Sequence, residues 1–136
     1  MGWAGFVDDA TIEHTVLGGG VRIPVLARLS IGPEVVYMVG PRDDRDLFVL
    51  GSLWFDVVRD RPDRHVEPCL VAGGGYMRHS DRFGGATFSS GEGSFTADGG
   101  ARVRVVDRIE VGAEIRVGWE LHMRVTATVG VRLPSR

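Results

Sequence analysis

The sequence predicts an all-β fold, a single-domain antiparallel β-barrel of roughly nine or ten strands that spans residues 1–136. Three observations predict it: an unbroken alternation of apolar and polar residues near the end of the chain, glycine clusters between apolar runs, and the lack of any helical period. From residue 101 to residue 133, 16 of the 17 odd-numbered positions are apolar. A β-sandwich or jelly roll is the alternative that the same short strands allow.

The elements follow from the glycine clusters, which we interpret as turns because glycine adopts positive φ without strain. The clusters stand at residues 18–20, 73–75, 84–85 and 99–100. One run, Leu47–Val58, is apolar on both faces, which predicts a strand that is covered on both sides. The runs between turns that we expect to form the first strands are Thr11–Leu17, Val21–Ile31, Glu34–Val39, Leu47–Val58, His65–Ala72, Tyr76–Phe83, Ala86–Ser90 and Gly93–Ala97.

The long alternation from residue 101 must turn, because 33 extended residues would span about 110 Å at about 3.3 Å each. A two-residue hairpin loop would switch the inward face from odd to even positions, and the sequence shows no switch. We therefore expect an odd-length loop at residues 110–114, with bends at Gly118 and Gly130. Bent strands favour a barrel, and its interior is predicted to be lined by the odd-numbered, apolar residues.

Composition bounds the setting of the protein. A net charge of −2 gives no reason to expect nucleic acid or an anionic membrane as a partner, and no apolar run reaches the ~18 residues of a membrane helix. The single cysteine, Cys69, excludes an internal disulfide, and no signal-peptide pattern precedes the strands. We therefore expect a cytoplasmic protein. All 16 basic residues are arginine, which suggests a GC-rich bacterium.

The predicted function is binding of a hydrophobic small molecule in an apolar cavity, either without chemistry or as a cofactor-free cyclase or isomerase that works by positioning its substrate. This layout is similar to small lipocalin-like and allene-oxide-cyclase-like barrels. The alternative is a non-catalytic module that oligomerises, most simply as a homodimer through the outer side of Leu47–Val58. The residues predicted to line the cavity are Trp54, Tyr76, Trp119, Leu121 and Met123.

Asp107 is the one polar residue on the apolar side of the alternation. A buried carboxylate is costly unless it is paired, so Asp107 is the candidate general acid or base. The other interpretation is that the chain bulges or turns there and leaves Asp107 solvated.

We expect no metal and no cofactor. The alternative is a non-haem iron site in which His79 and Asp81 share one strand face and His122 supplies the third ligand. With Arg132 ten residues further on, this layout resembles the 2-oxoglutarate-dependent oxygenases, in which such an arginine holds the cosubstrate carboxylate.

Overall fold

A computed structural model describes residues 2–9, 12–41, 44–58, 66–83, 85–106, 108–118 and 123–131 of the protein, with side chains from residue 14 onward except that of Phe83. Most of these residues lie in strands, as the alternation predicts. The strands are β1 (Gly2–Asp9), β2 (Ile12–Gly20), β3 (Ile23–Leu26), β4 (Leu29–Val39), β5 (Arg45–Asp56), β6 (Val66–Phe83), β7 (Ala86–Val106), β8 (Ile109–Gly118) and β9 (Met123–Val131).

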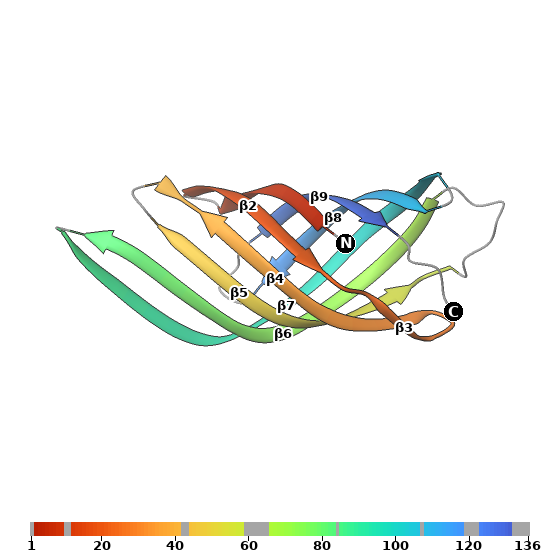
Figure 1. Ribbon diagram of the computed structural model, residues 1–136, viewed down its shortest axis with the longest axis horizontal. Helices are drawn as coiled ribbons and strands as arrows, with labels where there is room; N and C mark the ends of the chain where they lie inside the picture. The colour runs from red at the N-terminus through yellow and green to blue at the C-terminus, as the bar shows by residue number, and fades with distance from the viewer. Residues whose placement is uncertain are drawn as a thin grey trace.

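The strands close into an antiparallel barrel of eight, which confirms the predicted fold class (Figure 1). Each barrel strand pairs with its neighbour in the chain, β1 pairs with β9, and β2 pairs with β4. The short β3 continues beyond β2 and pairs with the first residues of β4, so it adds no position to the ring. The strand number is therefore slightly below the predicted nine or ten.

Two of the glycine clusters that we expected to form turns lie inside long strands instead. β6 and β7 pair without a register shift from Val66↔Val103 to Phe83↔Ala86, through residues 73–75 and 99–100. A Cβ atom at Gly75 would lie 2.0 Å from the carbonyl oxygen of Val49 on β5, so this glycine permits close approach of two backbones. The cluster at residues 18–20 likewise belongs to β2, and of the described glycines Gly85 has the one positive φ, 84°.

The predicted turn at residues 110–114 is also wrong, because β8 runs straight through it. The reversal comes earlier, where Val106 at the end of β7 pairs with Ile109 at the start of β8. The register shifts between Arg104 and Val106, which is a β-bulge with Val105 as the extra residue. The two-residue turn switches the inward parity and the bulge switches it back, so the alternation continues unchanged.

The faces of the barrel are the reverse of those predicted. In β9, the odd-numbered Val125 and Val129 are 49% and 54% exposed, while the even-numbered Arg124 and Thr126 are 6% and 3% exposed. β4, β5 and β8 show the same alternation of exposed odd and buried even residues. The apolar face is therefore the outer face. The polar face can lie inside because its charged groups pair with one another across the barrel.

β6 and β7 are the longest strands, with 18 and 21 residues against 9 to 12 in β4, β5, β8 and β9. Their hairpin projects well beyond the other strands at one end of the molecule, on the left in Figure 1. Residues 85–93 of this hairpin are exposed on both faces. We call residues 77–92 the β6–β7 ribbon, and the end of the barrel from which it projects the ribbon end.

Candidate functional site

The interior of the barrel is mainly polar. Among the described residues, 15 polar or charged residues are buried, against eight apolar ones. Buried charges are costly unless they are paired, so the arrangement requires ion pairs across the lumen. The buried charged residues other than His14 are Glu34, Asp46, Glu67, Asp98, Arg102, Glu110, Glu114, Arg116 and Arg124.

Arg116 on β8 is the centre of the largest group of ion pairs. Its guanidinium lies 3.0 Å (Nη1–Oε2) and 3.4 Å (Nη2–Oε1) from the carboxylate of Glu34 on β4. Its Nε also contacts Asp98 on β7, and its Nη2 lies 3.8 Å from Glu114. Ser52 on β5 donates a hydrogen bond to Glu34. These contacts link four strands through the lumen.

A second group of ion pairs lies toward the end opposite the ribbon. The carboxylate of Asp56 accepts hydrogen bonds from Arg22, at 2.6 Å, and from Arg102 on β7. Arg104 donates to Glu67 at 3.1 Å. Together with the pairs of Arg116, these contacts tie β4 through β8 to one another by charge as well as by backbone pairing.

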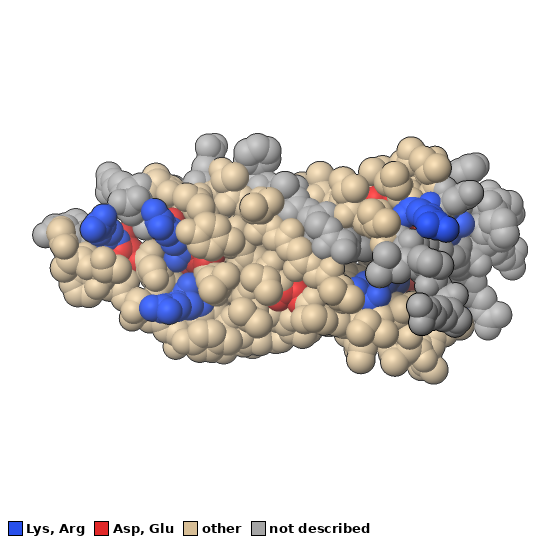
Figure 2. Space-filling model, viewed as in Figure 1, with Lys and Arg blue, Asp and Glu red and all other residues tan. Residues whose placement is uncertain are grey.

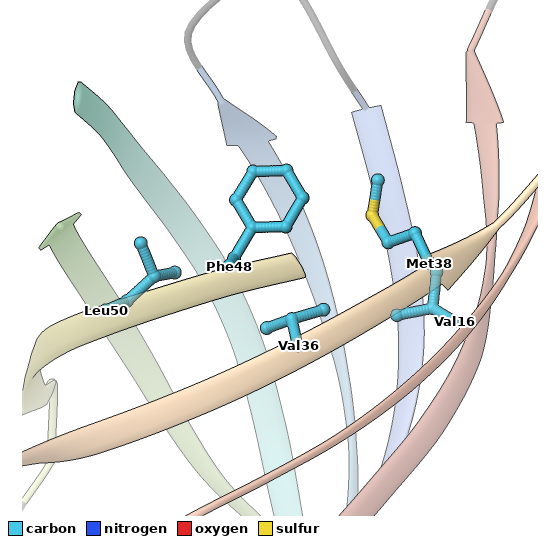
Figure 3. Close-up of a cluster of buried hydrophobic side chains, with 5 residues drawn as sticks. All are labelled: Val16, Val36, Met38, Phe48 and Leu50. Atoms are coloured by element: carbon cyan, nitrogen blue, oxygen red, sulfur yellow. The ribbon is translucent and has the colours of Figure 1, made fainter. Parts of the chain in front are cut away.

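Apolar side chains occupy the lumen between these ion pairs and the ribbon end. Phe48 and Leu50 from β5 project inward with Val16, Val36 and Met38 from β2 and β4 (Figure 3). Trp54, Cys69 and Val71 form a second buried cluster, which lies toward the opposite end, beside Asp56, the register partner of Cys69. An eight-stranded barrel is just wide enough to be filled by its own side chains, so these clusters and ion pairs occupy the lumen.

The outer face is apolar over most of its area. Thirty large apolar side chains are exposed among the described residues, including Leu53 and Phe55 on the outer side of β5. In the face seen in Figure 2, arginine side chains gather toward the two ends, and the middle carries one small acidic patch. We call the outer region between these two groups of arginines the apolar belt.

A cluster of two histidines and two aspartates lies at the ribbon end. His14 Nε2 is 3.1 Å from Asp44 Oδ2, and His79 Nδ1 is 2.6 Å from Asp46 Oδ1 and 3.4 Å from Asp44 Oδ1. His79 lies beyond the apolar belt, since its outward neighbour on β6 is the exposed Arg78. The hydrogen bond that His79 donates to the Asp46 carboxylate raises the pKa of His79 above its ordinary value, which favours the imidazolium.

A groove with a volume of about 410 Å³ opens on the outer face beside this cluster. Tyr37, Leu47 and Arg78 stand side by side across β4, β5 and β6, since they are register partners. The groove therefore joins the apolar belt to a basic rim. Its lining residues are Tyr37, Arg45, Leu47, Arg78, Ser80, Asp81, Arg82 and Thr87.

The structure separates the residues predicted to line an apolar cavity. Trp54 lies inside, but Tyr76 and Met123 are 52% and 47% exposed on the outer face, because the alternation is inverted relative to the prediction. Trp119, Leu121, His122 and the candidate catalytic Asp107 lie outside the described residues.

Of the residues predicted to bind iron, the structure describes His79 and Asp81. His79 does meet carboxylates, but those of Asp44 and Asp46 rather than the predicted partner, Asp81. Sequence reasoning missed these two aspartates because they stand in a polar loop and at the start of β5, 33 or more residues before His79. It also missed His14, whose position beside Val16 on one strand face favours a core histidine.

Fold and site together define a closed eight-stranded antiparallel barrel with an ion-paired lumen and an apolar outer surface. The chain matches the crystal structure of Neisserial surface protein A (NspA), also an eight-stranded barrel, over 97% of this chain and 93% of that chain, with a TM-score of 0.72 and 14% identity. No protein-family model and no curated protein matches the sequence. The described residues contain no helix long and apolar enough to cross a membrane.

Proposed function

We propose that the protein is a membrane-spanning β-barrel, without an open channel, that anchors the β6–β7 ribbon at a membrane surface. The observation that carries this proposal is the inverted distribution of residues, with an apolar belt outside and ion pairs inside. The proposal replaces the cytoplasmic location and the absence of a membrane partner expected from the sequence. That expectation was based on the lack of an apolar helix and of a leader peptide in the sequence. The sequence signal of a membrane strand is much weaker than that of a membrane helix.

The apolar belt is large enough to face a bilayer, and its exposure to water would be unfavourable. Monomeric soluble proteins rarely expose apolar patches larger than a few hundred Å², on the order of a few side chains. Sixteen large apolar side chains are exposed on β4, β5, β8 and β9 alone, which exceeds this by far. Membrane strands need about 9–11 residues when tilted. β4, β5, β8 and β9 have 9 to 12 residues, which agrees with that length.

The interior supports anchoring rather than conduction. The ion pairs of Arg116 bridge the lumen, and the cluster around Phe48 fills its ribbon half. The long β6–β7 hairpin then carries the distinctive surface of the molecule outside the belt. The fold neighbour is named a surface protein, and display of a ribbon at a surface agrees with that name.

The proposal is tested with neighbouring side chains on opposite faces of one strand. In a Cys69→Ser background, a fluorophore on Val35→Cys faces outward and one on Val36→Cys faces inward, at the same depth. In vesicles with spin-labelled acyl chains, we expect quenching of the outer label and little quenching of the inner one. Thermal unfolding of both labelled proteins serves as the control for folding.

Two outcomes would contradict the proposal. One is equal quenching of the two labels. The other is a water-soluble homodimer or larger oligomer that needs no detergent and in which the outer label is protected. The second outcome would support the alternative function, the oligomerising module predicted from Leu47–Val58, since a second copy would then cover the apolar belt.

A second candidate function, binding of a hydrophobic small molecule, is favoured by the outer groove. Apolar Tyr37 and Leu47 line one part of it and Arg45, Arg78 and Arg82 another, which suits an amphiphile with an anionic head group. Native mass spectrometry should show that phosphatidylglycerol is retained in preference to phosphatidylcholine. Replacing the three arginines by serine should abolish this preference, and the exposed Arg108→Ser should not. An unchanged preference in the triple variant would reject the groove.

A further inference from the structure

We propose that His14, Asp44 and Asp46 bind one divalent transition-metal ion, best matched by Zn²⁺, at the ribbon end of the barrel. One ligand atom from each of the three residues lies within 4.8 Å of the other two. Imidazole nitrogen and carboxylate oxygen are both Zn²⁺ ligands, and three protein ligands leave a fourth position for water or another molecule. This inference does not depend on the membrane proposal.

The distance between the ligand atoms of His14 and Asp44 is close to that in a coordination shell. Zn–N and Zn–O bonds of about 2.0–2.2 Å at tetrahedral angles place two ligand atoms about 3.3 Å apart. His14 Nε2 and Asp44 Oδ2 are 3.1 Å apart. A bound ion would therefore separate this pair only slightly. The two carboxylates carry a charge of −2, which the imidazolium of His79 offsets only in part, so the site favours a cation.

One carboxylate oxygen of Asp44 is available to coordinate a metal ion. Its Oδ1 is buried and has no hydrogen-bond partner within the described part of the chain. Its contact with His79 Nδ1, at 3.4 Å, is an ion pair rather than a short hydrogen bond. A buried carboxylate oxygen without a hydrogen bond is costly, and coordination of a cation would remove that cost.

The backbone holds these ligands in place before an ion arrives. Gly40 donates from its backbone nitrogen to the carbonyl of Asp44 at 2.9 Å, which closes the connection between β4 and β5. A Cβ atom at Gly40 would lie 2.5 Å from His14 Nε2, so the imidazole occupies space that only glycine leaves. Metal sites need such support to keep their ligands at bonding distance.

His79 acts as a positioning residue. It is the register partner of Asp46, and its Nδ1 hydrogen-bonds to that carboxylate at 2.6 Å. A carboxylate has about four lone-pair sites. Asp46 can therefore accept this bond and coordinate an ion at the same time. Histidine and carboxylate partners of this kind orient metal ligands and affect affinity by about 10–100-fold.

The test is equilibrium dialysis of the folded, chelator-stripped full chain against Zn²⁺. We expect one ion per chain and a higher unfolding temperature when it is bound. Asp44→Asn and Asp46→Asn should each weaken binding by more than about 100-fold, and His79→Phe by about 10–100-fold. Gly40→Ala should weaken binding without removing any ligand. Asp44→Asn retains the size of the side chain and lies in a connection, so the test does not depend on a variant of the buried His14.

The matched controls are Asp81→Asn and His122→Ala, which remove the other two members of the iron site predicted from sequence. We expect both to bind Zn²⁺ like the wild type. Circular dichroism and metal-free unfolding temperatures confirm that each variant is folded. Absence of stoichiometric Zn²⁺ would overturn the proposal. Binding that survives Asp44→Asn and Asp46→Asn but is lost in Asp81→Asn and His122→Ala would instead assign the site to the set predicted from sequence.

Discussion

Glu34 and Arg116 are 82 residues apart in the chain and form a two-contact ion pair inside the barrel. Their side chains are 2% and 3% exposed, so the pair is shielded from water. β4 and β8 are not neighbours in the sheet, which means that the pair crosses the lumen. Removal of one member would leave a buried charge on the other side of the barrel.

Arg116→Met should lower the free energy of unfolding by about 3–5 kcal/mol, because it leaves the Glu34 carboxylate buried without its cation. Adding Glu34→Gln to Arg116→Met should recover part of the loss. The measurement is urea unfolding in detergent micelles, followed by circular dichroism. The exposed Arg108→Met is the control and should change stability by less than about 0.5 kcal/mol. Strictly additive effects of Arg116→Met and Glu34→Gln would mean that the pair contributes no coupling.

Val49→Arg, near the middle of β5 on the outer face, should destabilise the protein in lipid vesicles by about 2–4 kcal/mol, the cost of arginine at the middle of a bilayer. Val106→Arg, at the end of β7, should cost only about 0–1 kcal/mol because it lies near the edge of the belt. Both wild-type side chains are exposed, at 49% and 58%. Denaturant unfolding in vesicles compares the two variants. Equal costs would indicate that the belt does not cross a bilayer.

Deletion of Val105 should be tolerated. It removes the extra residue of the bulge while Arg104 can still pair with Glu110 and Val106 with Ile109. Deletion of Val111, the third residue of β8, should prevent folding because it moves the rest of that strand to the opposite face, with Arg116 toward the outside. Folding yield and far-ultraviolet circular dichroism distinguish the two deletions. Similar yields would show that the bulge does not determine which face of β8 points into the barrel.

Shortening the ribbon should leave the barrel intact. Ser80 and Ser89 are register partners, so residues 81–88 can be replaced by Asn-Gly as a two-residue turn. We expect the unfolding temperature to change little, because residues 85–88 are exposed on both faces and Asp81 is only half-buried. As a control, the same turn inserted at residues 84–85 without a deletion should also be neutral. A large loss of stability would mean that the ribbon packs on the barrel.

Sequence reasoning singled out one member of the histidine–aspartate cluster at the ribbon end, His79, and missed the other three for a physical reason. His79 could be identified because histidine and aspartate two residues apart share a strand face. Its actual partner, Asp46, lies on β5 and becomes its neighbour only through the β5–β6 register. His14 reaches Asp44 across the β2–β4 pairing that completes the ring. Such contacts depend on closure of the sheet, which no local pattern records.

The sequence by itself determined that the chain forms strands with one apolar and one polar face, and it favoured a barrel over a β-sandwich without deciding between them. Alternation has a period of two, and it is preserved whichever face turns inward. The tertiary structure decided that the polar face is inside, because closure brings Arg116 to Glu34 and Asp98 and so allows buried charges to pair. The apolar face, from Val35 on β4 to Val129 on β9, is thereby left outside.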